Sequence, residues 1–197
     1  NIRTTVAEVA GIAQNLGLNY EIILVNDGSR DRTGEIGRAL AAYIPEFRLV
    51  EHYPNRGYGG ALKAGFAAAR KDLIVFFPGD NQFYFGEITR LLEKIDEADM
   101  VCGYRANRQD PFMRKVNAFG WNMIIRVLFG YLTRDIDCGF KLFRREILSQ
   151  VTIESDGALI DTEFLSGARA HGLKITEVAV THRAREGGEA TGANIHV

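Results

Sequence analysis

The chain has 197 residues, of which 46% are hydrophobic and 25% charged, and its net charge is -1 at pH 7. This composition is that of one soluble globular domain with a substantial core, and the near-neutral charge gives no reason to expect nucleic acid as a partner. Its two cysteines, Cys102 and Cys138, lack metal-ligand spacing, so a reducing compartment such as the cytoplasm is expected.

Strands and helices alternate through the first half of the chain. Apolar residues at helical spacing predict an opening helix over residues 1–16, which Gly17 ends. The elements predicted after it are, in chain order, Glu21–Val25 (strand), Asp31–Tyr43 (helix), Phe47–Glu51 (strand), Ala61–Arg70 (helix), Leu73–Phe77 (strand), Phe85–Ile95 (helix) and Asp99–Gly103 (strand). This alternation predicts an α/β fold with a mostly parallel sheet and helices on both faces.

The second half of the chain is less regular. A long amphipathic helix is predicted over Phe112–Leu132, followed by a strand at Cys138–Arg144, a helix at Asp161–His171 and a strand at Lys174–Val180. The tail His182–Val197 is rich in Gly, Arg and polar residues and is predicted to be a loop. We expect the apolar face of the long helix to pack into the core rather than against a membrane.

The first candidate site is the turn Asn26-Asp27-Gly28-Ser29, between a predicted strand and helix. At the carboxyl end of the strand, Asp27 can accept hydrogen bonds from a nucleotide base or ribose. Gly28 allows a positive φ or a close approach of backbone, and Ser29 or Asp31 can cap the helix. A plain capped turn with no ligand is the alternative.

The second candidate is the glycine-rich segment Asn55–Gly60, which includes Gly57 and precedes a helix. Backbone amides at a helix N-terminus favour an anion, and Lys63, one turn further on, can face a phosphate or solvent. The segment lacks the ending of a P-loop and the full dinucleotide fingerprint, so neither of those sites is expected.

The third candidate follows the most continuous apolar strand, Leu73–Phe77, whose composition indicates burial on both faces. Asp80 and Gln82 come just after it, and a carboxylate with a carboxamide suits a hard divalent cation such as Mg²⁺ held against a phosphate. Taken alone, Asp80 is better explained as a turn residue than as a metal ligand. We expect the three candidates to converge on one ligand, because the carboxyl ends of parallel strands share one edge of a sheet.

A basic segment and two further motifs complete the candidates. Residues 103–145 hold nine Lys or Arg against three Asp, which indicates either a local anionic ligand or a solvated face. The segment contains several arginines, among them Arg105 and Arg114, and a phosphate clamp needs two or more guanidinium groups. Asp161 and Glu163 begin a predicted helix, where acidic residues also suit the helix dipole.

Four stretches of the sequence resemble one known family, the family-2 glycosyltransferases of GT-A fold. They are NDGSRDRT, NRGYGGALKAGF, GDNQF and DCGFKLFRR, and they are most similar to the polyprenyl-phosphate branch, the dolichol-phosphate mannose synthase-like enzymes. The family's Asp-x-Asp-x-Gln metal motif falls on residues 78–82, where Pro78 replaces the first Asp and Asp80 and Gln82 match the second Asp and the Gln.

The resemblance implies an inverting transfer of a hexose from a nucleotide-diphosphate sugar, of the GDP-mannose or UDP-glucose type, to a polyprenyl or dolichyl phosphate. It implies Mg²⁺ or Mn²⁺ at Asp80 and Gln82, and anion positioning by Arg105, Arg114 and Arg185. The expected nucleotide-sugar residues are Asp27, Gly28, Ser29, Gly57, Lys63 and Asp80. Glu163 or Asp161 is expected to orient the sugar or an arginine, and Arg185 is favoured over His182, which is expected to be an exposed loop residue.

Two other functions stay open at this point. One is a family-2 enzyme with a sugar hydroxyl as acceptor, in which Asp161 or Glu163 is the general base. The other is a nucleotide-sugar-binding module without catalysis, which the replacement at Pro78 suggests. In each case the resemblance implies a single GT-A domain that lacks the family's first strand and any C-terminal membrane segment, acting in the cytoplasm at the surface of a membrane.

Overall fold

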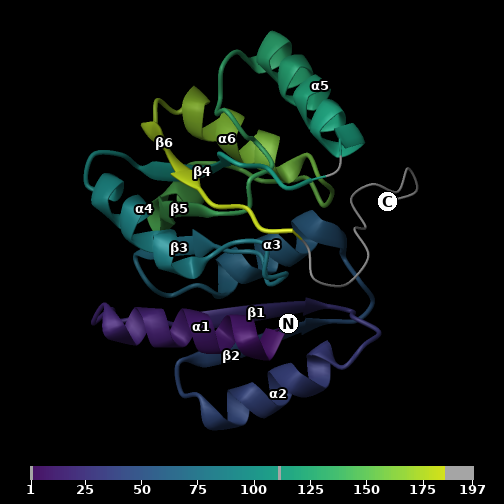
Figure 1. Ribbon diagram of the computed structural model, residues 1–197, viewed down its shortest axis with the longest axis vertical. Coiled ribbons are helices and arrows are strands. Elements are labelled where there is room, and N and C mark those ends of the chain that lie inside the picture. The colour runs from purple at the N-terminus through teal and green to yellow at the C-terminus, as the bar shows by residue number, and fades with distance from the viewer. Residues whose placement is uncertain (1, 111, 185–197) are drawn as a thin grey trace. The chain divides into compact units, whose positions relative to one another are not determined.

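A computed structural model describes residues 2–110 and 112–184, except for the side chain of residue 114 (Figure 1). The described chain divides into two compact units. The first comprises residues 2–72 and 153–160, and the second comprises residues 73–152 and 161–184.

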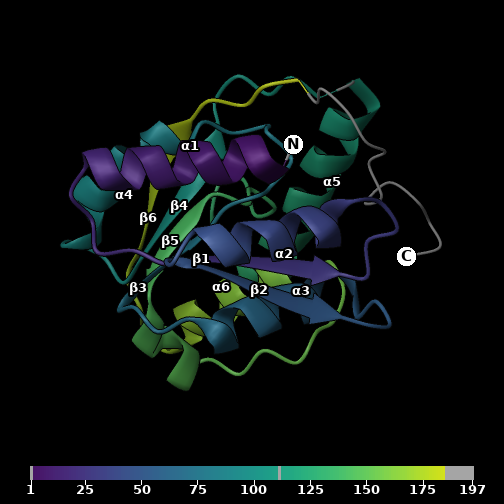
Figure 2. The same cartoon turned by 90° about the horizontal axis from the view of Figure 1, so that it is seen from below.

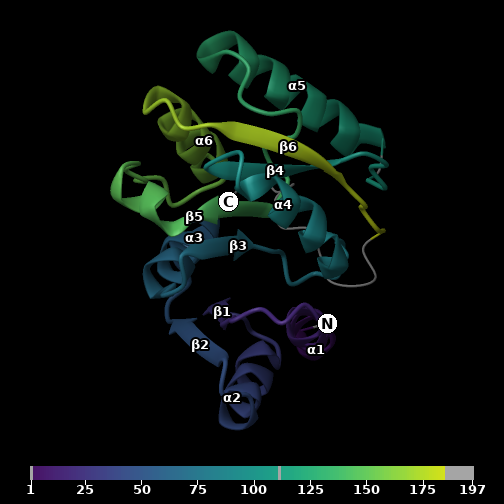
Figure 3. The ribbon, with the colours of Figure 1, turned by 90° about the vertical axis from the view of Figure 1, so that its left-hand side faces the viewer.

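The first unit is built on two parallel strands, β1 (Ile22–Asp27) and β2 (Phe47–His52). Figure 2 and Figure 3 show the two strands side by side. Asp27 is paired to His52 at the end of the ladder. Three helices complete the unit: α1 (Ile2–Asn15), α2 (Thr33–Tyr43) and α3 (Gly57–Ala68). Gly37 lets α2 approach the sheet closely, because a Cβ added there would lie 2.9 Å from a methyl carbon of Leu49.

The second unit contains a four-stranded mixed sheet in the order β3-β5-β4-β6. Its strands are β3 (Leu73–Phe76), β4 (Met100–Arg105), β5 (Lys141–Arg144) and β6 (Ile175–Val180). β4 and β6 are parallel, whereas β5 runs antiparallel to both β3 and β4. The predicted α/β class is therefore confirmed, and the antiparallel β5 makes the sheet mixed.

Five helical segments accompany this sheet in the described chain: η1 (Phe85–Glu87), α4 (Ile88–Ile95), α5 (Phe112–Phe129), η2 (Arg145–Ser149) and α6 (Ile160–Ala170). The core is formed where sheet and helices meet. Met100, Phe143 and Leu165 are fully buried there, each 0% exposed. β4 is buried over Met100–Gly103, whereas in β3 only Ile74 is buried, so the expected burial of the Leu73–Phe77 strand on both faces is wrong. β3 lies at an edge of the described sheet, where one side of the strand has no neighbouring strand.

One predicted boundary is wrong in an informative way. Residues 57–60 were expected to form a turn before a helix at Ala61, but α3 begins at Gly57. The glycines are helical because another segment packs against them: a Cβ at Gly59 would lie 2.5 Å from the carbonyl oxygen of Ser155. Their small size serves helix packing as well as turn formation.

The expected burial of the long helix is also wrong. In α5, Ile125 is 2% exposed, but Phe112 is 76%, Phe119 69% and Val127 77% exposed. Figure 1 and Figure 3 show α5 beyond β6 and α6, with the remainder of its unit on one side only. Within residues 2–110 and 112–184, no helix is both long enough and apolar enough to span a membrane.

Candidate functional site

The side chain of Asp27 is held in place at the carboxyl end of β1. Its Oδ1 accepts hydrogen bonds from Nδ1 of His52 (2.7 Å) and from the backbone amide of Arg56 (2.9 Å). The Asn55 side chain donates to the Asp27 carbonyl at 2.6 Å. Both side-chain contacts fall on Oδ1, so Oδ2 is the oxygen that can accept a hydrogen bond from a ligand hydroxyl or amine.

The turn after Asp27 is shaped by its neighbours. Gly28 has φ +70°, and a Cβ there would lie 3.1 Å from the amide nitrogen of Asn55, so both the conformation and the space favour glycine. The Ser29 amide donates to Oδ1 of Asn26 at 3.2 Å. Of the two predicted caps, Asp31 makes the contact with the helix start, because its Oδ1 accepts from the Thr33 amide at 3.0 Å.

The N-terminus of α3 is engaged by the segment at residues 153–160. The Gly59 amide donates to the Asp156 carbonyl at 2.8 Å. Nζ of Lys63 lies 2.7 Å from Oδ1 of Asp156 and donates to the Glu154 carbonyl at 2.8 Å. Lys63 therefore faces a carboxylate of its own chain, and a phosphate at Gly57 and Lys63 has to displace or join Asp156.

The turn at Asp80–Gln82 follows β3 in the second unit. Asn81 adopts φ 63°, and Oδ1 of Asp80 accepts from the Gln82 amide at 3.2 Å. Gln82 is 7% exposed and is tied to Arg183 in both directions: the Arg183 amide donates to the Gln82 carbonyl at 2.7 Å, and Nε2 of Gln82 donates to the Arg183 carbonyl at 3.3 Å. A cation can be bound by this side chain only through Oε1.

Pro78, which replaces the first Asp of the family motif, has a packing role. Its ring lies against Gly139, where an added Cβ would come within 2.5 Å of the proline Cγ. The donors near this turn are then the Asp80 carboxylate and the Gln82 amide oxygen, both hard ligands of the kind that Mg²⁺ or Mn²⁺ accepts when substrate oxygens complete the shell. Within the described residues, no cluster of three or more His, Cys, Asp or Glu side chains has metal-binding geometry.

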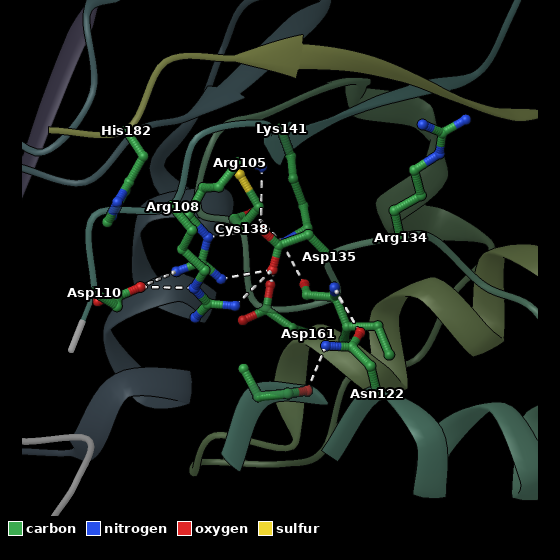
Figure 4. A network of polar contacts seen from close by, with 12 residues as sticks. Arg105, Arg108, Asp110, Asn122, Arg134, Asp135, Cys138, Lys141, Asp161 and His182 are labelled. Carbon is green, nitrogen blue, oxygen red and sulfur yellow. Dashed lines mark hydrogen bonds and ion pairs between the residues drawn. The ribbon is translucent and has the colours of Figure 1, made fainter. Parts of the chain in front are cut away.

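Arg105 is committed to a buried ion pair (Figure 4). Its Nε and one terminal nitrogen lie 2.6 Å from the two carboxylate oxygens of Asp135, and the Arg105 side chain is only 10% exposed. Beside it, Nε of Arg108 donates to Asp110 at 2.6 Å, and cross contacts of 3.8 Å join the two pairs. The edge of Arg105 that was expected to clamp a phosphate is occupied by Asp135, so the geometry favours a positioning role.

Three groups of this cluster, Arg105, Asp110 and Asp135, have pKa values shifted in the direction that favours the charged form. Burial opposes ionisation of Asp135, but hydrogen bonds and charge from Arg105 outweigh it and lower the pKa of the Asp135 carboxyl. Burial likewise opposes the charge on Arg105, and Asp135 raises the pKa of that guanidinium. The pKa of Asp110 is lowered too, since Arg108 outweighs its burial. Two cations and two anions therefore cancel within the cluster.

His182 was expected to be exposed, and this is wrong. It is 4% exposed, its Nδ1 accepts from the Gln109 amide at 3.2 Å, and its ring meets Phe83 edge to face at 5.4 Å. Burial lowers the pKa of His182, although Asp110 partly opposes that effect. A neutral His182 then joins the segment after β6 to the loop that follows β4.

Asp161 is paired with Lys141 inside the second unit. Nζ of Lys141 lies 2.6 Å from Oδ1 of Asp161 and also donates to the carbonyls of Cys138 (2.6 Å) and Ile136 (3.0 Å). Burial disfavours the ammonium, but Asp161 raises the pKa of Lys141 overall. A carboxylate held in this way is a poor general base, because taking up a proton leaves a buried lysine without its counter-ion.

The remaining candidates are Glu163, Arg114 and Arg185. Glu163 lies half-buried in the first turn of α6, where its carbonyl accepts from the Ser166 hydroxyl at 3.1 Å. Arg114 lies on α5, and its side chain is outside the described part of the chain, as is the whole of Arg185. Asp137 is an exposed residue, but the surrounding protein partly buries its carboxyl group. This burial, together with the charge of Asp161, raises the pKa of Asp137.

The candidate residues fall into two groups, one in each unit. The first unit holds Asp27, Gly28, Ser29, Gly57 and Lys63, and the second holds Asp80, Gln82, Arg105, Asp161 and Glu163. Their convergence on one ligand stays a prediction. Sequence reasoning missed the supporting residues His52, Arg56, Asp135 and Arg183. Asp135 gave a signal, since an acidic residue in a basic segment is a natural partner for a buried arginine.

The family model and the relatives in sequence both identify this chain as similar to glycosyltransferases. The model of glycosyl transferase family 2 matches residues 1–152. The chain is 31% identical over 183 residues to a dolichyl-phosphate beta-glucosyltransferase of Dictyostelium discoideum, covering 85% of this chain and 56% of the relative. It is 32% identical over 194 residues to a dodecaprenyl-phosphate galacturonate synthase of Rhizobium johnstonii, covering 93% of this chain and 55% of the relative. The chain thus spans about half the length of these curated relatives.

Solved structures agree on the fold. A glucosyl-3-phosphoglycerate synthase from Mycobacterium tuberculosis in complex with phosphoglyceric acid aligns with TM-score 0.70 at 20% identity, covering 96% of this chain and 70% of that one. Its complex with Mn²⁺, uridine diphosphate and glucosyl-3-phosphoglycerate aligns with TM-score 0.68 at 20% identity, again covering 96% and 70%. With a GT-A-like α/β fold and a family match over most of its length, the chain belongs to glycosyltransferase family 2.

Proposed function

We propose that this chain is a catalytic GT-A domain that transfers a hexose, with inversion, from a nucleotide-diphosphate sugar to a polyprenyl phosphate. The donor is of the GDP-mannose or UDP-glucose type. The printed functions of the similar dolichyl- and dodecaprenyl-phosphate enzymes support a lipid phosphate as acceptor.

The observation that carries the proposal is the Asp80–Gln82 turn at the carboxyl end of β3. Its shape is fixed by the positive φ of Asn81, and Gln82 is held by Arg183 from across the unit. A preorganised pair of hard oxygen donors is what a divalent cation and a diphosphate require. The Mn²⁺ complexes of the structurally similar glucosyl-3-phosphoglycerate synthase are consistent with such a use.

Each residue has a limited task in this mechanism. A bound Mg²⁺ or Mn²⁺ at Asp80 and Gln82 would take up charge that develops on the leaving diphosphate. Asp27, oriented by His52 and Arg56, accepts hydrogen bonds from the nucleoside through Oδ2. An acceptor phosphate oxygen attacks the anomeric carbon as the bond to the diphosphate breaks, and Arg114 and Arg185 are proposed to position these anions.

The state of Asp161 bears on the choice of acceptor. A phosphate oxygen is already anionic near neutral pH and needs no base, whereas a sugar hydroxyl does. Asp161 is bonded to Lys141 at 2.6 Å and is poorly placed to take up a proton. This pairing favours the phosphate acceptor and leaves Glu163 as the candidate base for a hydroxyl acceptor.

The decisive experiment measures transfer and donor binding in parallel. With Mn²⁺ present, UDP-glucose or GDP-mannose should raise the melting temperature, and label from the donor should appear in a short-chain prenyl phosphate. Asp80→Ala should remove both effects while the circular dichroism spectrum is unchanged, and Asp96→Ala, at the end of α4, serves as the matched control. Binding without transfer in the wild type would favour a non-catalytic nucleotide-sugar-binding module.

A further inference from the structure

One face of α5 is an unusually long apolar surface. Phe112, Val116, Phe119, Met123 and Val127 follow one another at intervals of three or four residues, so they lie on one side of the helix. They are 76%, 44%, 69%, 47% and 77% exposed, in that order. These five residues are called the α5 stripe below. Contiguous exposed apolar surface of this kind marks an interaction site on a soluble protein.

The opposite side of the helix is anchored, so the orientation of the α5 stripe is fixed. Ile125 is 2% exposed and forms part of the core. Oδ1 of Asn122 accepts from the Ile136 amide at 3.3 Å, while its Nδ2 donates to the Ala118 carbonyl at 2.7 Å. The helix thus attaches through the row that holds Asn122 and Ile125. The exposed apolar surface is centred on the α5 stripe and extends beyond it to Met113, Ile124, Leu128 and Phe129, which are 64%, 53%, 67% and 53% exposed.

The charges of α5 indicate what covers the stripe. Among its eighteen residues are Arg114, Lys115 and Arg126, and none is Asp or Glu. Lys115 and Arg126 are exposed, and the Arg126 guanidinium lies 5.1 Å from the centre of the Tyr131 ring. A helix with bulky apolar and aromatic residues on one face and only basic charges beside them is suited to an anionic lipid interface. A second copy of the same surface is disfavoured, because self-association across a two-fold axis brings like charges together.

We propose that the α5 stripe docks this protein onto an anionic lipid surface, with the apolar side chains below the headgroups and Lys115 and Arg126 among the lipid phosphates. The inference rests on the proposed function, since a polyprenyl phosphate resides in a bilayer and a domain that uses it must work at that surface. It adds the element by which the domain approaches the acceptor.

The test is flotation of the chain with vesicles of phosphatidylcholine alone or mixed with phosphatidylglycerol, with no donor and no acceptor present. Binding is expected for the mixed vesicles and is expected to weaken as salt is raised. The double variant Phe119→Ser/Val127→Ser should weaken partition at least about tenfold, because two bulky apolar side chains no longer leave water. Lys115→Gln should weaken it less. Tyr43→Ser, at an 86% exposed aromatic on α2, is the matched control and should bind as the wild type does.

Several results would overturn the inference. They are no binding to either vesicle, equal binding by the double variant, or a dimer in analytical ultracentrifugation that the double variant dissociates. Transfer to a water-soluble short-chain prenyl phosphate separates this inference from the proposed function. The double variant should retain the wild-type rate there, while its rate on vesicle-borne acceptor falls. Vesicle binding without transfer to any acceptor would leave docking by α5 intact and reject the proposed function alone.

Discussion

At the scale of single residues, the most informative contact is that between Asp27 and His52. Nδ1 of His52, buried at the end of β2, lies 2.7 Å from Oδ1 of Asp27 and holds that carboxylate in one orientation. The proposed role of Asp27 in nucleoside binding requires such an orientation. The two residues are paired in the β1–β2 ladder, so the contact follows directly from the strand register. It was not predicted because a sequence does not state the register of parallel strands.

His52→Ala is therefore expected to weaken nucleotide binding by about 10- to 150-fold, since a hydrogen bond to a charged group contributes about 1.5–3 kcal/mol. Isothermal titration with the nucleoside diphosphate measures the effect, and His171→Ala, at an exposed position, is the control. In a double-mutant cycle the effects of His52→Ala and Asp27→Ala should not add. Additive effects would show that His52 does not act through Asp27.

The buried thiols give a prediction about pH. Burial raises the pKa of Cys102 to about 12 and, with Asp135 adding to the effect, that of Cys138 to about 11, from an ordinary value of 9.0. Only the thiolate reacts, so neither cysteine should be alkylated at pH 8 in the native protein, whereas both should be after unfolding. Mass spectrometry counts the modified thiols.

The same shifts set the sign of the stability change. Above pH 9 the unfolded chain loses thiol protons that the folded chain retains, so the free energy of unfolding should fall as pH rises from 9 toward 11–12. A Cys102→Ala/Cys138→Ala variant should show a shallower fall in urea titrations over that range. An identical slope in both proteins would contradict the assignment.

A substitution in the Arg105–Asp135 pair can distinguish a positioning role of Arg105 from a direct role in phosphate binding. Asp135→Asn leaves the buried Arg105 charge with only its 3.8 Å contact to Asp110, so it is expected to lower the free energy of unfolding by up to about 3–5 kcal/mol. Urea unfolding measures this, and Glu35→Gln, which breaks the exposed pair with Arg32, should leave stability unchanged. A fully stable Asp135→Asn protein that fails only to bind acceptor would return Arg105 to the role that the sequence suggested.

At the scale of elements, the glycines of α3 carry the contact with the segment at residues 153–160. Gly59→Ala places a Cβ about where backbone already lies, 2.5 Å from the Ser155 carbonyl oxygen. The variant is expected to be about 1–3 kcal/mol less stable by urea unfolding, as is usual for overpacking. Gly11→Ala is the matched control: it lies inside α1 with nothing within 4 Å and should gain about 0.5–1 kcal/mol. Equal behaviour of the two variants would contradict the close contact.

Most strands and helices were predictable from apolar periodicity, and their observed bounds differ from the prediction by a few residues. The exceptions have physical reasons. The start of α3 was misplaced because glycine usually breaks a helix, and only the packing of Ser155 and Asp156 makes helical glycines favourable here. The face of α5 was misjudged because periodicity identifies an apolar face but not what covers it.

At the scale of the whole molecule, part of the basic excess of residues 103–145 is neutralised by carboxylates of the chain itself, rather than left for an anionic ligand. Arg105 and Arg108 are neutralised by Asp135 and Asp110, and Lys141 by Asp161. The excess positive charge therefore belongs largely to the remaining residues of the segment, which include those of α5. The sequence correctly located Asp80 and Gln82 after a strand, and Asp27, predicted in the turn, is the last residue of β1. It could not show which arginines have partners, because that depends on tertiary contacts.

The two-way contact between Gln82 and Arg183 has a consequence for how this molecule is made. The partners are separated by 101 positions along the chain, so the turn that follows β3 gains its support only after the strand at Ile175–Val180 has been synthesised and has paired. Contacts of such long range close late, since the entropy of a large loop must first be overcome. On the ribosome, the core strands can assemble before Gln82 is secured, and the nascent chain should complete this turn, the proposed cation site, as one of its last folding steps.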